Sequence, residues 1–190
     1  GRHYAWRHLW MLVVLLALGT WAARGNLRPV SGLIFERESP YNLIQVVELN
    51  NTRYLLLNEG QGVHSVYHPE KIDSGGTWDY YLTAAFFNKP PVAPSHVENV
   101  AIIGLAAGTI SRQYSDVFGD IPITGIEIDG EIIAVGQRFF GMQQTNLRII
   151  EADGRLALAN LTEQFSVIAV DAYRLPYIPW HLTTREFFGE

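Results

Sequence analysis

Two apolar runs on either side of a turn of small residues constrain the fold of this chain most. The first run ends at Ile103, and the small residues of positions 104–109 follow it at once. The second run, residues 123–128, carries Glu127 near its tip. This pattern is typical of a strand, a tight turn that opens a helix, and a second strand that ends in an acid. Because Glu127 lies about 20 residues beyond the turn, the sequence predicts a nucleotide-binding βαβ unit.

Strands and helices alternate along the C-terminal half, which predicts a Rossmann-like parallel sheet wound with helices. Four strands make only part of such a sheet. We therefore expect the sheet to be incomplete, with the chain either a fragment or completed by another chain. The expected strands lie near residues 100–103, 123–128, 147–151 and 166–170, and the expected helices near residues 109–117, 131–140 and 155–161.

The segment before this unit has a different pattern. Residues 43–49 and 53–57 are apolar runs joined by Asn50-Asn51, a pair typical of a β-hairpin turn. Residues 63–67 are expected to add a strand, and residues 77–87 a helix. We therefore predict an α/β chain in three parts: a membrane anchor at 1–30, a small β-rich domain with one helix at 31–88, and a Rossmann-like nucleotide-binding domain at 97–190.

The predicted anchor rests on residues 9–23, which carry no charge. Such a run is short against the roughly 20 residues that cross a bilayer. It is interpreted as a short or tilted transmembrane helix, with the apolar region of a signal peptide and a buried core helix as alternatives. Arginines flank it on both sides and leave its orientation open. We expect a membrane localisation, with the nucleotide-binding domain in the cytoplasm.

Composition and charge exclude several functions. The chain of 190 residues has no cysteine, which rules out disulfides, thiolate zinc sites and a cysteine nucleophile. Its first 30 residues hold four arginines and no acid, and the rest holds 10 basic and 19 acidic residues. A body this acidic argues against nucleic-acid binding. His64 and His68 have no third ligand in view, so no metal site is predicted.

The turn itself indicates which nucleotide is bound. The dinucleotide fingerprint G-x-G-x-x-G would need glycine at positions 104, 106 and 109, and Ala106 and Thr109 break it. Interpreted as the looser G-x-G-x-G turn of S-adenosylmethionine enzymes, Gly104, Ala106 and Gly108 fit with one small departure. The alternative is that these glycines only make tight turns.

Three acids follow strands at the same expected edge of the sheet. Glu127 can accept hydrogen bonds from both ribose hydroxyls, and Asp153-Gly154 is placed to receive the adenine amino group. Asp171 ends the fourth strand, at the carboxyl edge where open α/β sheets bind ligands. The alternative is that the acids cap helices. His181, near the same edge, is either a proton carrier or a loop residue bonded to the backbone.

With these residues assembled, the chain resembles the spermidine synthase (polyamine aminopropyltransferase) family. The segments 39–42, 55–61 and 78–81 resemble its S-x-Y-Q motif, its L-L-L-D-G-x-Q turn and its tyrosine-bearing helix. The resemblance implies a β-domain over a methyltransferase-like domain. It also implies aminopropyl transfer from decarboxylated S-adenosylmethionine to an amine in polyamine biosynthesis. It makes Asp171 the catalytic acid and assigns Gln61, Tyr80 and Tyr173 to the substrate side.

The chain departs from the family at the amine-binding acids. The family turn G-G-G-D-G-G has its acid where this chain has Ala107, and D-S-S-D after the fourth strand corresponds to residues 171–174, Asp-Ala-Tyr-Arg. Two carboxylates are therefore missing, and Arg174 brings a positive charge. An acceptor other than a simple diamine is expected. Residues 178–187 resemble the membrane-attached spermidine-synthase-like proteins.

Two hypotheses about function follow. The first is a membrane-anchored transferase that binds S-adenosylmethionine or its decarboxylated form, with Asp171 as general base. The alternative is a non-catalytic structural or accessory subunit of a membrane protein complex, with other subunits or a second copy as partners. An ordinary methyltransferase is a third option, against which the β-rich domain argues.

Overall fold

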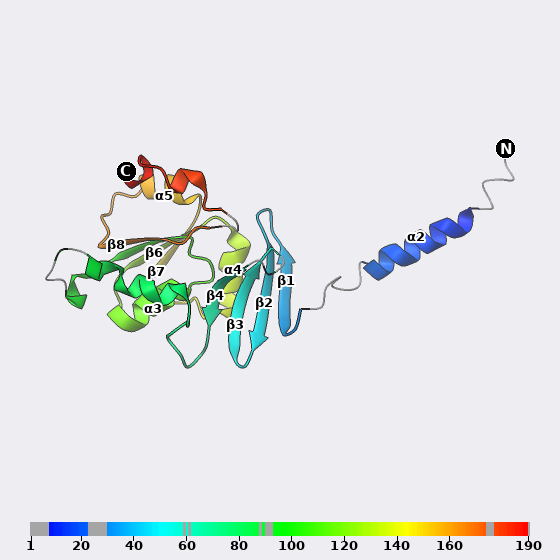
Figure 1. Ribbon diagram of the computed structural model, residues 1–190, viewed down its shortest axis with the longest axis horizontal. Coiled ribbons are helices and arrows are strands. Elements are labelled where there is room, and N and C mark those ends of the chain that lie inside the picture. The colour runs from blue at the N-terminus through cyan, green and yellow to red at the C-terminus, as the bar shows by residue number, and fades with distance from the viewer. Residues whose placement is uncertain are drawn as a thin grey trace. The chain divides into compact units, whose positions relative to one another are not determined.

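The computed structural model describes residues 8–22, 30–58, 60, 62–87, 89, 93–173 and 177–189. The chain forms two compact units, Gly1–Ser31 and Gly32–Glu190. The first unit contains one described helix, and the second contains two sheets and the helices that cover them (Figure 1).

The helix of the first unit is too short for the predicted anchor. Helix α2 spans Leu9–Ala22 and has 14 residues. At 1.5 Å per residue it covers about 21 Å, less than the roughly 30 Å of a hydrocarbon core. Within the described ranges, no helix combines the length and the apolar character that a membrane crossing requires. The predicted transmembrane helix at residues 9–23 is therefore wrong, and so is the membrane localisation drawn from it.

The second unit begins with an antiparallel sheet in which each strand pairs with the next. Leu49 lies opposite Thr52, so a two-residue loop joins two strands, and Asn50 and Asn51 have φ angles of 51° and 63°. Two consecutive residues with positive φ make the turn that suits a twisted hairpin, and asparagine tolerates that conformation well. The strands are β1 (Leu33–Glu38), β2 (Leu43–Leu49), β3 (Thr52–Leu57) and β4 (Gly62–Tyr67).

The C-terminal part of the unit is a parallel sheet of order β7-β6-β5-β8. The two central strands are buried along their whole length, which is why β5 is an unbroken apolar run and why β6 carries no charge before Glu127 at its tip. The elements lie within one or two residues of the ranges that the sequence predicts. They are β5 (Val100–Ile103), α3 (Thr109–Phe118), β6 (Ile123–Glu127), α4 (Gly130–Phe139), β7 (Leu147–Glu151), α5 (Gly154–Ala159) and β8 (Val167–Val170).

Helices cover both faces of this sheet (Figure 1). Ile102 points into a core with α3 and the 3₁₀ helix η1 (Thr77–Phe87), whereas its neighbour Ile103 points into a core with α5. Two short 3₁₀ helices, η3 (Trp180–Leu182) and η4 (Phe187–Gly189), complete the second core. The alternation of a β-strand thus assigns successive side chains of β5 to opposite layers.

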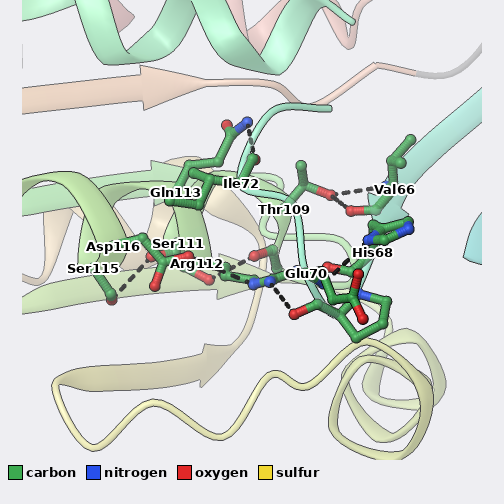
Figure 2. A network of polar contacts seen from close by, with 12 residues as sticks. Val66, His68, Glu70, Ile72, Thr109, Ser111, Arg112, Gln113, Ser115 and Asp116 are labelled. Carbon is green, nitrogen blue, oxygen red and sulfur yellow. Dashed lines mark hydrogen bonds and ion pairs between the residues drawn. The ribbon is translucent and has the colours of Figure 1, made fainter. Parts of the chain in front are cut away.

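Helix α3 ties the two sheets together (Figure 2). The Thr109 hydroxyl accepts the N–H of Val66 at 2.9 Å and donates to its carbonyl at 3.0 Å. Arg112 donates to the carbonyl of His68 at 2.7 Å, and Gln113 donates to the carbonyl of Ile72 at 3.1 Å. Positions i, i+3 and i+4 share one face of a helix, so a single face holds β4 and the chain that follows it.

Candidate active site

A cavity of about 250 Å³ opens at the carboxyl edge of the parallel sheet. This is the edge at which open α/β sheets bind ligands. Gly108 and Tyr80 are absent from its described lining, and Gln61 and Arg174 lie outside the described residues. The residues predicted from the sequence that do share this lining are Gly104, Ala106, Glu127, Asp153, Gly154, Asp171, Tyr173 and His181.

The turn after β5 passes very close to the end of β8. Gly104 has a φ of +84°, and a Cβ there would lie 2.8 Å from the backbone of Asp171 and Ala172. Gly108 has a φ of +88°, and a Cβ there would lie 2.8 Å from the side chain of Met142. Both positions therefore need glycine, for conformation and for space.

Ala106 is the departure from the glycine pattern, and its backbone adopts a strained conformation. Its φ is 49°, in the left-handed region that alanine disfavours by about 1–2 kcal/mol. Its N–H donates to Glu127 Oε2 at 2.9 Å, which holds the turn in place. The surrounding contacts thus maintain a conformation that glycine adopts without strain.

We expect Ala106→Gly to raise the free energy of unfolding by about 0.5–1 kcal/mol, because the relief of strain exceeds the chain entropy that glycine loses. Ala107→Gly is the matched control. Ala107 is buried and lacks a positive φ, so its substitution should cost about 1 kcal/mol. Urea denaturation of both variants measures the difference. A loss of stability in Ala106→Gly as large as in Ala107→Gly would contradict this account.

Glu127 holds the turn from the tip of β6. Its Oε1 accepts the N–H of Asp129 at 3.1 Å, and its Oε2 accepts the N–H of Ala106. The side chain is buried, and burial raises the pKa of its carboxyl group. Each oxygen has a second lone pair, so the carboxylate can still accept hydrogen bonds from a ligand in the cavity.

Asp153 has structural partners of its own. Its Oδ1 accepts the N–H groups of Arg155 and Leu156 at 3.1 Å, which makes it the N-cap of α5. Its Oδ2 lies 3.1 Å from Nε2 of His181. Gly154 lets α5 approach the sheet, because a Cβ there would overlap the side chain of Ile103. The capping role that the sequence left open is therefore present at Asp153.

Asp129 connects the two sheets at the same edge. It caps α4 through the N–H of Glu131 at 3.1 Å. Its Oδ2 also accepts the Ser39 hydroxyl at 2.6 Å and the side-chain amide of Asn42 at 3.0 Å. The Ser-Pro-Tyr-Asn segment is thus held against the cavity, and Asn42 belongs to its lining. The motif at residues 39–42 is recognisable in the sequence, but its contact with Asp129 is not, because about 90 residues separate the partners.

Asp171 lies at the end of β8 and has two aromatic donors. The indole N–H of Trp78 donates to Oδ2 at 3.1 Å, and the Tyr81 hydroxyl lies 3.3 Å from Oδ1. Burial raises the pKa of Asp171 to about 6. Burial, and then the charge of Asp171, raise the pKa of Tyr81. Tyr80, the predicted substrate residue, is 73% exposed and has no place at this site.

Tyr173 and His64 form the wall beside Asp171. Their rings stack at 4.8 Å between centroids, and the Tyr173 hydroxyl donates to the carbonyl of Val63 at 3.3 Å. Burial lowers the pKa of His64, which favours its neutral form. Burial, and then Asp171, raise the pKa of Tyr173. Tyr173, in the loop after β8, therefore connects this loop to β4 at the cavity wall.

Ala107, where the related turn has an acid, belongs to the apolar core. Its side chain is 1% exposed and packs with Ile44, Leu55 and Ile132. Its N–H donates to the Ser65 hydroxyl at 2.9 Å. This position contributes packing and no charge.

Comparison with known proteins agrees with this architecture. No family model matches the chain. A protein of Bifidobacterium longum described as a probable polyamine aminopropyl transferase is 34% identical over 158 residues, or 83% of this chain and 34% of that protein. The polyamine aminopropyltransferase of Vibrio vulnificus is 30% identical over 169 residues, or 84% of this chain and 54% of that protein. The solved structure of a probable spermidine synthase from Corynebacterium glutamicum matches with a TM-score of 0.67 at 19% identity, over 85% of this chain and 58% of that one.

The fold is a small antiparallel sheet ahead of a methyltransferase-type parallel sheet, with a cavity at the carboxyl edge that is lined by acids and by apolar side chains. Over 83–84% of its length the chain is similar to these curated aminopropyltransferases, which confirms the resemblance to the spermidine synthase (polyamine aminopropyltransferase) family drawn from its motifs. It spans 34% and 54% of the lengths of the two curated relatives.

Proposed function

We propose that this chain carries the site of an alkyl transferase of the aminopropyltransferase type, which moves an alkyl group from a sulfonium nucleotide to an amine. The nucleotide is decarboxylated S-adenosylmethionine or S-adenosylmethionine. The observation that carries this proposal is the position of Asp171. It lies between the cavity that contains Gly104 and Glu127 and a second cavity that contains none of the turn residues.

The residues around the first cavity suit the nucleoside. Gly104 and Ala106 bring the backbone of the turn to the cavity wall without large side chains. Glu127 offers free lone pairs to two ribose hydroxyls. Asp153 has its Oδ2 engaged by His181, so an adenine amino group would share that oxygen or replace the histidine. The remaining lining is largely apolar, as a flat base requires.

The position of Asp171 suits a residue that binds and deprotonates the acceptor amine. In its carboxylate form it orients the amine through a hydrogen bond and receives the proton that the amine must lose. The bound nucleotide supplies an electrophilic carbon: a carbon–nitrogen bond forms there while the carbon–sulfur bond breaks, and the electron pair of that bond returns to sulfur. Trp78 and Tyr81 keep the carboxylate pointed at the junction of the cavities.

Calorimetric titration with 5′-methylthioadenosine, S-adenosylmethionine and its decarboxylated form tests the nucleotide site. We expect at least one of the three to bind, and Glu127→Gln to weaken binding by about tenfold because one charge-assisted acceptor is lost. Glu151→Gln is the control, since Glu151 lies opposite Glu127 on the neighbouring strand and outside the cavity lining. Equal affinity in both variants would refute the ribose role of Glu127, and no binding at all would refute the proposal.

A nucleotide-binding protein without transfer activity is the second candidate. The buried methyl group of Ala107, at the position of an amine-binding acid, favours it. The two candidates differ in one result. Formation of an alkylated amine by the nucleotide-loaded chain supports the transferase, and tight nucleotide binding without any product supports the second candidate.

A further inference from the structure

A second cavity, of about 490 Å³, adjoins Asp171. It shares a wall with the first cavity, formed by the loop after β8, and it contains neither Glu127 nor the glycine turn. Asp171 therefore stands where the two spaces meet. The described residues that line the second cavity are Tyr81, Val170, Asp171, Ala172, Tyr173, Tyr177, Ile178, Leu182, Thr183 and Phe188.

The charge in this lining is concentrated at one end. Among its described residues, Asp171 is the sole side chain with a formal charge. The others are aliphatic or aromatic, apart from the hydroxyls of Thr183 and the tyrosines. A ligand that enters here thus meets one carboxylate at the junction and apolar groups, such as Ile178 and Phe188, beyond it.

From this arrangement we infer that the acceptor is a primary amine with one cationic end and an apolar chain. The inference rests on the proposed transferase function and names its acceptor class. The ammonium or amine group pairs with Asp171, beside the nucleotide cavity. The hydrocarbon chain extends along Val170, Ile178 and Phe188.

The same lining disfavours a diamine. A second ammonium group would lie beside apolar side chains with no carboxylate partner among the described lining residues. Because Ile178 and Phe188 are 54% and 74% exposed, it would keep part of its hydration and lose only the rest. A methyl group at that position gains from burial instead, at about fourfold in affinity for each buried methylene. The two effects act in the same direction, so together they should favour the methyl end by about tenfold.

Two probes of equal size measure this preference. Hexylamine and 1,5-diaminopentane have the same number of non-hydrogen atoms and differ in whether the far end is a methyl or an ammonium group. We expect calorimetry on the 190-residue chain, with and without 5′-methylthioadenosine, to show hexylamine binding at least about tenfold more tightly. Equal or tighter binding of the diamine, or no binding of either amine, overturns the inference. Failure of 5′-methylthioadenosine alone to bind counts against the transferase and leaves the amine comparison decisive.

A designed second carboxylate makes the test sharper. Ile178 is 54% exposed, so substitutions there should leave folding intact. Ile178→Glu is expected to shift the ratio of affinities toward the diamine by about tenfold, whereas Ile178→Gln, equal in size and neutral, should leave it near the original value. An identical ratio in the two variants would show that the chain of the amine does not extend along Ile178 and would overturn the proposed position.

Discussion

Replacing Asp171 by Asn is expected to lower the rate of transfer by about 10²–10⁴-fold and to make the protein more stable at pH 7. The rate falls because the amide cannot receive the proton from the acceptor. Stability rises because burial disfavours the charged carboxyl group, whose pKa goes from 3.8 to about 6. A shift of this size corresponds to at most about 3 kcal/mol, lessened by the partial exposure of the group. Loss of activity together with a gain in stability is typical of a site residue held in unfavourable surroundings.

The dependence on pH follows from the direction of the same shift. Between pH 3.8 and about 6 the folded state binds more protons at Asp171 than the unfolded state does. The contribution of Asp171 to stability therefore falls as pH rises through this window and is constant above it. In the proposed transfer reaction the carboxylate is the active form of Asp171, so the rate should rise with pH through about 6. The Asn variant should lack both effects.

Asp120→Asn is the control, because it makes the same chemical change at an exposed position. Its transfer rate and stability should stay close to those of the original chain. Urea denaturation at pH 4 and pH 7, with product measured by mass spectrometry, gives both quantities. Transfer that survives in Asp171→Asn would refute the role as a base. A loss of stability in that variant at pH 7 would refute the unfavourable burial.

The sequence predicted the elements that depend on residues close together in the chain or on a general rule of sheet geometry. The apolar run at residues 100–103 and the mostly apolar run at residues 123–126 are the buried central strands of the parallel sheet. The Asn50-Asn51 pair is a hairpin turn because asparagine tolerates positive φ. Glu127 and Asp171 meet the same cavity because parallel strands end at one edge. For the strands and the turn, the chain within a few residues determines the result, and for the two acids the parallel order of the strands determines it.

The rest depended on contacts between distant segments or on helix type. The sequence predicted a helix at residues 77–87 and Tyr80 on the substrate side. The helix is 3₁₀, so residues three apart share a face, and Trp78 and Tyr81 reach Asp171 while Tyr80 points to solvent. The three-residue spacing of Trp78 and Tyr81 was the signal in the sequence that could have placed both side chains on one face. The bond between His181 and Asp153 has no local signal, because 28 residues separate the partners.

Gly104→Ala is expected to lower the free energy of unfolding by roughly 2–5 kcal/mol. About 1–2 kcal/mol comes from the left-handed backbone, and roughly 1–3 kcal/mol from a contact that the packing cannot absorb. The new Cβ would lie 2.8 Å from the carbonyl group of Asp171, and backbone on both sides leaves no flexible side chain to move. Either the turn or the end of β8 must shift. Because a shift of about 1 Å at reacting groups can cost 10²-fold in rate, transfer should fall along with stability.

Gly75→Ala separates the two contributions. Gly75 has a φ of +66°, comparable to that of Gly104, and a Cβ there would meet nothing within 4 Å. Its substitution should cost only the conformational part, about 1–2 kcal/mol, with nucleotide affinity unchanged. Urea denaturation and calorimetry of both variants measure the difference. If the two substitutions cost the same, the close approach of the turn to Asp171 contributes nothing, and the turn could then move freely relative to the base. A larger cost at Gly104, accompanied by weaker nucleotide binding, would mean that one glycine sets the distance between the nucleotide and the acceptor.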